Sequence, residues 1–202
     1  MLHLKDVHTY YGMSHVLHGV NMSLATGEAV SLIGRNGAGK TTLMRTVMQL
    51  TPPRSGSILI DGDVDLTQLK PHQVFRHGVR LCPQGRAVFP KLTVEENLEL
   101  ALVAQHVDDP SQEIENTFER FEILGVKRNQ KVRELSGGQR QILAVARALL
   151  GHTATLLMDE PSEGLAPIMV RELRDLILDI KKTDITILLA EQNVKMALSA
   201  CD

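Results

Sequence analysis

The chain has 202 residues, a length that suits one domain with a sizeable core. Its formal net charge of -2 gives no broad basic field, so the composition argues against nucleic acid as a partner. The two cysteines, Cys82 and Cys201, lack the spacing of a zinc site or a disulfide framework, and the apolar runs are shorter than a membrane span. We therefore expect a soluble protein with reduced thiols.

The first 30 residues predict short strands. Val20, Met22 and Leu24 alternate with polar residues, and the glycine at position 27 is typical of a turn before the next strand. Tyr10 and Tyr11 lie between the first two strands, in a chain with few aromatic residues. Each is explained either as a core or edge residue or as a ring that stacks on a nucleobase.

The strongest motif is the segment from residue 29 to residue 46, AVSLIGRNGAGKTTLMRT. A short apolar strand, a glycine loop and a helix follow one another, which is the setting of a phosphate-binding P-loop. The glycines let backbone amides point at an anion, and the helix adds the positive end of its dipole. We predict that Lys40 binds the β- and γ-phosphates and that the Thr41 hydroxyl ligates Mg²⁺. The predicted phosphate-binding residues are Gly34, Arg35, Asn36, Gly37, Ala38, Gly39, Lys40, Thr41 and Thr42.

The middle of the chain predicts a strand at 57–60, a short helix at 71–77 and a strand at 79–82. Gln84 follows the last of these strands. Its amide can coordinate Mg²⁺ or water, and the alternative is a surface glutamine in a turn.

Residues 93–132 contain helical patterns and no candidate strand. Thr93 and Glu96 have the spacing of a capping box, and a second helical pattern leads from position 114 to a stop at Gly125. This predicts one domain over 1–202, with a helical subdomain at 89–152 inserted into an α/β core with a β part, formed by 1–88 and 153–202.

A further helix begins with a Ser-Gly-Gly sequence. Ser136 can cap it, and a capped N-terminus with two glycines can bind an anion in the same way as a P-loop. The alternative is an ordinary capped core helix. The candidate anion-binding residues of this segment are Ser136, Gly137, Gly138 and Gln139.

An apolar strand at 155–158 ends in two acidic residues. A buried parallel strand brings Asp159 and Glu160 to the carboxyl edge of the sheet, beside the P-loop. Asp159 can then hold Mg²⁺ through water, and Glu160, on the opposite face of the pleat, can deprotonate an attacking water. A strand predicted at 184–190 ends at the same edge, in front of Gln192.

Taken together, these motifs resemble the nucleotide-binding subunit of ABC transporters. Residues 34–41 match its P-loop, Gln84 its switch glutamine, residues 135–139 its LSGGQ signature, and Asp159 and Glu160 its Walker B acids. Tyr11 lies at the A-loop position. The phrases GRNGAGKTT, MDEPSEGLAP and LAEQN look most like the ATPase of branched-chain amino acid uptake, with the urea-transport ATPase close behind because of PQGRAVFP.

The resemblance implies an α/β fold: a RecA-like P-loop NTPase core with a mainly parallel sheet, an N-terminal antiparallel β part and a helical subdomain. It implies ATP and Mg²⁺ as cofactors, with Thr41, Gln84 and Asp159 at the metal. Two cassettes, identical or different, would pack head to tail, so that Ser136 contacts the γ-phosphate bound by its partner. Permease subunits and a periplasmic or extracellular solute-binding protein would complete an importer, with this subunit on the cytoplasmic face of the membrane.

Two departures from the family pattern affect catalysis. The switch histidine is replaced by Gln192, which can donate a hydrogen bond to the γ-phosphate but cannot carry a positive charge. The usual D-loop aspartate is replaced by Ala166. Both replacements leave two alternatives open. One is that the chain pairs with a different cassette that has the usual histidine and aspartate, and the other is that it is a regulatory subunit with little ATP turnover. Relatives also continue beyond residue 202, so we expect a trimmed or partial chain.

The alternative functions belong to different classes. An importer of urea or amides uses the same chemistry. An ABC ATPase that acts on nucleic acid or ribosomes usually carries a coiled-coil insertion or two cassettes in one chain. This chain has one cassette and a near-neutral charge, which disfavours that alternative.

Overall fold

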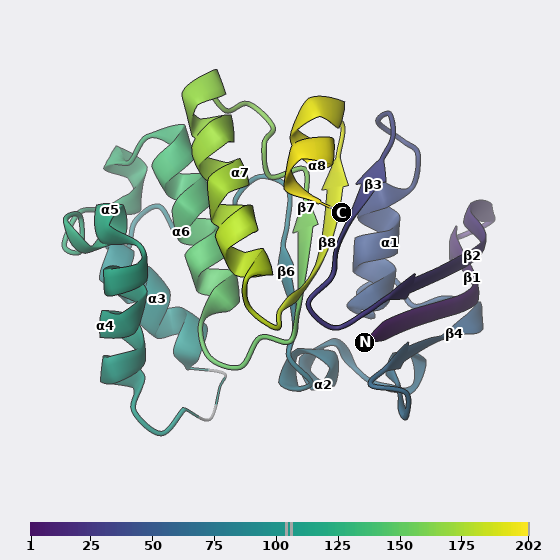
Figure 1. The fold of residues 1–202 in the computed structure, drawn as a ribbon. Helices are drawn as coiled ribbons and strands as arrows, with labels where there is room; N and C mark the ends of the chain where they lie inside the picture. Colours follow the sequence, from purple (N-terminus) through teal and green to yellow (C-terminus); the bar gives the residue numbers. More distant parts are fainter. Residues whose placement is uncertain (104, 106, 202) are drawn as a thin grey trace.

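The computed structural model describes residues 1–103, 105 and 107–201, and its strands form two sheets (Figure 1). An antiparallel sheet has the order β2-β1-β4-β5, and a parallel sheet has the order β3-β8-β7-β6. The antiparallel strands are β1 (Leu2–Tyr11), β2 (Ser14–Leu24), β4 (Ser55–Ile60) and β5 (Val64–Asp65). The parallel strands are β3 (Ala29–Ile33), β6 (Val79–Cys82), β7 (Thr155–Asp159) and β8 (Thr186–Glu191).

The parallel sheet brings segments that are far apart in the sequence to one edge. In its register Ile33 lies opposite Glu191, and Asp159 lies opposite Ala190. The loop after β3 and the acids after β7 therefore lie at the same carboxyl edge, as parallel strands require. All residues of β7 and β8 are buried, which explains why the sequence shows continuous apolar runs there instead of alternation.

Helices cover the parallel sheet, and a group of helices lies on the side of it that is remote from the antiparallel sheet (Figure 1). The helices α3, α4, α5 and α6 lie together at one end of the molecule, and α1 lies between the two sheets. The α-helices are α1 (Lys40–Val47), α2 (Pro71–Arg76), α3 (Val94–Leu102), α4 (Pro110–Arg120), α5 (Glu122–Gly125), α6 (Gly137–Leu149), α7 (Pro167–Lys181) and α8 (Val194–Ala200), and short 3₁₀ helices occupy Leu66–Gln68 and Val132–Glu134.

The predicted helix ending at Gly125 is interrupted. The backbone of Phe121 leaves the helical conformation with φ of -120° and ψ of 69°, so α4 ends there and α5 begins. Ile114, Phe118 and Leu124 are nevertheless buried with Phe121, as their spacing predicts. The capping box at Thr93 is confirmed, because its hydroxyl accepts from the Glu96 amide at 3.1 Å and its own amide donates to the Glu96 carboxylate at 2.7 Å.

The core lies on both faces of the parallel sheet. Leu156 and Met158 of β7 pack into a cluster with α3 to α8, whereas Leu157 packs into a second cluster with the antiparallel sheet and α1. The first cluster contains residues of the predicted helical subdomain and also Cys82 and Leu156 outside it. The core is therefore continuous across positions 89 and 152, and the subdomain boundaries stay a prediction. Within the described residues, no helix combines the length and the apolar character that a membrane span needs.

Candidate functional site

A hollow of about 210 Å³ opens at the carboxyl edge of the parallel sheet. It brings together residues predicted from three separate motifs: the loop before α1, the loop after β6 and the end of β7. Its lining residues are Val16, Asn36, Gly37, Gly39, Lys40, Thr41, Thr42, Gln84 and Glu160.

Lys40 is the cation of this hollow, and it is almost completely buried at 7% exposure. Its Nζ donates to the carbonyl oxygens of Gly34 at 2.7 Å and Arg35 at 3.2 Å. It also forms an ion pair with Oε1 of Glu160 at 2.9 Å. The ammonium group is thus aimed at the centre of the glycine loop, where an anion would meet it.

Glu160 reaches Lys40 because the backbone turns out of the strand. β7 ends at Asp159, and Glu160 has a φ of 46°, in the left-handed region that non-glycine residues rarely adopt. Its amide donates to the Ala190 carbonyl at 2.9 Å, which fixes this turn against β8. The expected placement of Glu160 by pleat alternation is therefore wrong. A local left-handed turn directs its carboxylate to the P-loop.

Asp159 and Thr41 form the oxygen-rich part of the site. The Thr41 hydroxyl donates to Oδ1 of Asp159 at 3.1 Å, and Asp159 is buried. Burial raises the pKa of Asp159, and the neighbouring Glu160 carboxylate raises it further, while the bond from Thr41 opposes both effects. A hydroxyl and a carboxylate suit Mg²⁺, which binds proteins through one or two carboxylates and completes its shell with phosphates and water. The described residues contain no group of three His, Cys, Asp or Glu that could hold a metal by itself.

The two adjacent tyrosines have different surroundings. The Tyr10 ring stacks on His15 with centroids 4.1 Å apart, and the Arg54 guanidinium lies 3.9 Å from its centroid. Because groups this close cannot share one face, both faces of Tyr10 are covered. The Tyr11 side chain is 47% exposed, and a hydrogen bond with Thr51 lowers the pKa of its hydroxyl. The structure leaves Tyr11 available to a nucleobase, and that role stays a prediction.

Gln84 and Gln192 each line a hollow that Glu160 also lines. Nε2 of Gln84 donates to Oε2 of Glu163 at 2.8 Å, and Gln192 is exposed beside a second hollow that Glu160 and Glu163 also line. The sequence analysis did not identify Glu163. The feature of the sequence that could have indicated it is its position, three residues after Glu160.

Glu191 is a second residue that sequence reasoning missed. It is buried at the end of β8, where its carboxylate accepts from the backbone amides of Ser162 at 3.0 Å and Asn193 at 3.2 Å. One bond fixes the turn that follows Glu160, and the other fixes the loop that carries Gln192. A predicted strand end placed this residue at the edge of the sheet, but its burial could not be read from the sequence.

The Ser-Gly-Gly segment forms a capped helix start away from Lys40. The Ser136 hydroxyl accepts from the Gln139 amide at 3.2 Å, and the Gln139 side chain accepts from the Ser136 amide at 2.9 Å. Gly138 is buried against α7, where a Cβ atom would collide with the side chain of Met169. Ser136 is exposed, and the lining of the hollow at Lys40 includes no residue of this segment.

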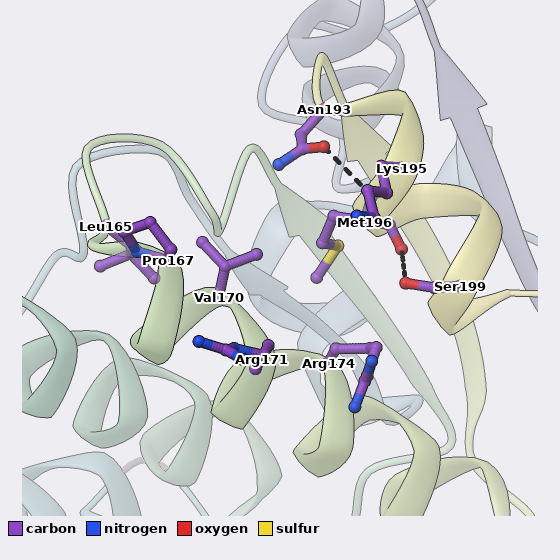
Figure 2. A pocket seen from close by; sticks show the side chains of 9 residues that line it. All are labelled: Leu165, Pro167, Val170, Arg171, Arg174, Asn193, Lys195, Met196 and Ser199. Atoms are coloured by element: carbon purple, nitrogen blue, oxygen red, sulfur yellow. Dashed lines mark hydrogen bonds between the residues drawn. The ribbon is translucent and has the colours of Figure 1, made fainter.

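A separate groove of about 450 Å³ lies between α7 and α8 (Figure 2). Asn193 lies at its upper rim, and its Oδ1 accepts from the Met196 amide at 3.1 Å, which caps α8 directly after Gln192. None of the predicted site residues lines this groove. The Asn193 cap at the rim of the groove affects the site only indirectly, because it fixes where the loop that carries Gln192 ends and α8 begins.

The comparison with protein families decides the assignment. A family model described as ABC transporter matches residues 17–163, which is well over half of the chain. The chain belongs to the ABC transporter family. The predicted resemblance and the predicted fold class are thereby confirmed.

Known ABC proteins match almost the whole cassette. The high-affinity branched-chain amino acid transport ATP-binding protein of Pseudomonas aeruginosa is 39% identical over 202 residues, covering 100% of this chain and 86% of that protein. The probable branched-chain amino acid transport ATP-binding protein of Archaeoglobus fulgidus is 34% identical, with 100% and 86% covered. The lipopolysaccharide export system ATP-binding protein of Escherichia coli K12 is also 34% identical, with 98% and 83% covered.

Solved structures agree with the fold. An ABC transporter cassette in its ADP conformation has a TM-score of 0.89 at 26% identity, covering 100% of this chain and 85% of that chain. A dimeric cassette in a post-hydrolysis state, bound to ADP and phosphate, has a TM-score of 0.87 at 25% identity, with 99% and 91% covered. This ABC cassette is an ATPase that converts ATP and water to ADP and phosphate, coupled to transport.

The raised pKa of Asp159 predicts a stability cost that depends on pH. The folded cassette binds a proton at Asp159 more readily than the unfolded chain, so the carboxylate destabilises the fold once the pH rises above its pKa. Asp159→Asn keeps an oxygen for Thr41 and removes the charge. We expect its melting temperature to exceed that of the parent by a few degrees at pH 7.5. The difference should shrink as the pH falls towards the pKa of Asp159, because the parent carboxyl group then becomes protonated in the folded protein. Asp63→Asn, at an exposed position, is the control. A lower melting temperature, or a gain that is independent of pH, contradicts this account.

Proposed function

We propose that this cassette uses Mg²⁺ and ATP to power an importer of branched-chain amino acids. The observation that supports this transport role is the 39% identity, over the whole chain, to the ATP-binding protein of the Pseudomonas aeruginosa system. The chemistry is supported by the convergence of Lys40, Thr41, Asp159 and Glu160 at one sheet edge.

The Lys40–Glu160 ion pair suggests how binding and catalysis are linked. The γ-phosphate of ATP is a stronger anion than a carboxylate and competes with Glu160 for the Lys40 ammonium. Once the phosphate holds Lys40, the Glu160 carboxylate is free to accept a proton from the attacking water. Thr41 and Asp159 would hold Mg²⁺ against the phosphates, where it neutralises the charge that develops during transfer.

The incomplete hollow supports a composite site in a dimer. A volume of about 210 Å³ is small beside the roughly 300–1,000 Å³ of typical ligand pockets. Ser136 is exposed at the start of α6, and it is not among the residues that line the hollow. A second cassette, identical or different, would bring its Ser136, Gly137 and Gly138 to the γ-phosphate and close the site. The solved structure bound to ADP and phosphate is dimeric.

The remaining parts of the proposal concern the membrane. Permease subunits would hold the cassette at the cytoplasmic face, and a solute-binding protein outside would deliver the amino acid. A second candidate function is export of a lipid-linked polysaccharide. It is favoured by the 34% identity to the Escherichia coli lipopolysaccharide export protein.

Replacement of Glu160 tests the catalytic base. Glu160→Gln keeps the size of the side chain and one acceptor oxygen but cannot accept the proton. We expect ATP turnover to fall about a hundredfold or more while ATP binding, measured by equilibrium titration, persists. Glu163→Gln is the neighbouring control, for which a much smaller loss is expected. Turnover that survives in Glu160→Gln removes the assignment.

A mixing experiment tests the composite site. Lys40→Ala removes the cation that binds phosphate in one chain, and Ser136→Ala removes the hydroxyl that the start of α6 would present to the partner's γ-phosphate. Each variant alone should be nearly inactive. A mixture contains heterodimers with one site that has both parts intact, so activity should return. If the parent dimerises with ATP under the same conditions and the mixture stays inactive, the two motifs do not share a site.

Gene deletion and uptake assays test the transported solute. Cells that lack this gene should lose high-affinity uptake of radiolabelled leucine, isoleucine and valine. The parent gene should restore it, and the Lys40→Ala variant should not. Unchanged leucine uptake together with a defect in outer-membrane lipopolysaccharide would favour the export function instead.

A further inference from the structure

The loop after β6 carries an arginine, Arg86, to which the sequence analysis assigns no role. Arg86 has a φ of 73° and Ala87 a φ of 35°, so two consecutive non-glycine residues adopt left-handed conformations. Such residues persist only where the surroundings hold them. Arg147 of α6 provides one such hold, because its guanidinium donates to the Ala87 carbonyl and lies 4.9 Å from the Phe89 ring centroid. The backbone at Arg86 is thereby anchored to the signature helix α6.

The Arg86 side chain bridges two other segments. Its guanidinium atoms lie 3.5–3.7 Å from the point that a Cβ on Gly137 would occupy, at the first residue of α6. Nη2 lies 3.4 Å from the Glu163 carbonyl that it donates to, and 3.8 Å from the corresponding point on Gly164. One planar group therefore lies beside the tip of the signature helix and is hydrogen-bonded to the turn that follows Glu160.

The electrostatics argue against a role in helix stability alone. The N-terminus of a helix carries partial positive charge, so a cation beside Gly137 is unfavourable for α6 by itself. Among the described residues, no ion pair joins Arg86 to an acidic side chain. The arrangement is explained if the guanidinium serves to hold two segments in register through its flat, forked shape.

We propose that Arg86 is a positioning residue, which sets the signature tip at Gly137 relative to the Glu163–Gly164 turn. This rests on the proposed composite site. In that site, the turn beside Glu160 belongs to the nucleotide bound by the same chain, and the signature tip serves the nucleotide of the partner. Arg86 thus links the two nucleotide sites of a dimer through one side chain. Gln84 adds a parallel contact, because it also bonds to Glu163.

The test measures ATP-driven dimerisation in a Glu160→Gln background, in which slow hydrolysis keeps ATP bound. The variants are Arg86→Ala and Arg86→Lys, with Arg133→Ala as a control that removes an exposed cation near the signature. Size-exclusion chromatography over a titration of ATP and Mg²⁺ gives the half-maximal ATP concentration. A fluorescent ATP analogue gives the affinity of the monomer at protein concentrations below dimerisation, and thermal melting confirms folding.

We expect both Arg86 variants to need about tenfold more ATP for dimerisation, with monomer affinity unchanged, while Arg133→Ala matches the background. In the otherwise native enzyme, KM for ATP should rise by a similar factor while kcat at saturating ATP changes little. Lysine should not rescue the function, because a point charge cannot span both contacts. Rescue by lysine, unchanged dimerisation of Arg86→Ala, or an equal loss of monomer affinity each overturns the proposal. If the background protein itself does not dimerise, the composite site has failed, which is a distinguishable result.

Discussion

The candidate site depends on one buried ion pair, between Lys40 at the start of α1 and Glu160 just after β7. Both side chains are less than a tenth exposed, and their charged atoms are 2.9 Å apart. Burying two charges is expensive, and such a pair is weak evidence for stability because apolar residues of the same size often do as well. Its value is therefore functional. The pair keeps a lysine and a carboxyl group buried and adjacent, in the place where a phosphate can exchange for the carboxyl group.

The parallel sheet makes this pair possible. Lys40 and Glu160 are far apart in the sequence, and β8 stands between the strands that carry them. Backbone bonds tie both loops to that central strand: the Gly34 amide donates to the Glu191 carbonyl, and the Glu160 amide donates to the Ala190 carbonyl. A buried Glu191 carboxylate then holds the amides at Ser162 and Asn193. The site is built on strand ends and short turns, so its geometry is set by the most rigid part of the fold.

Much of this could be predicted from the sequence because short motifs carry their own physics. A strand followed by GRNGAGKTT predicts an anion-binding loop, and an apolar strand ending in two acids predicts its partner at the same edge. The left-handed turn at Glu160 could not be predicted, because it depends on a bond to a strand 30 residues further on. The interruption at Phe121 and the contacts of Glu163 and Arg86 were likewise beyond prediction. They arise from tertiary packing, which can override local propensity.

The same geometry explains why one cassette holds two half-sites. The hollow at Lys40 ends at Gln84 and Glu160, whereas the capped start of α6 is exposed elsewhere on the same chain. Gly138 fixes α6 against Met169 of α7, and α7 begins directly after the turn that contains Glu163. The loop after β6 contacts that turn through Gln84 and the start of α6 through Arg86. Through these contacts, a displacement of the turn beside Glu160 can move the start of α6, which belongs to the other half-site. If two chains complete each other's sites, the fold of a single chain already contains the physical connection between them.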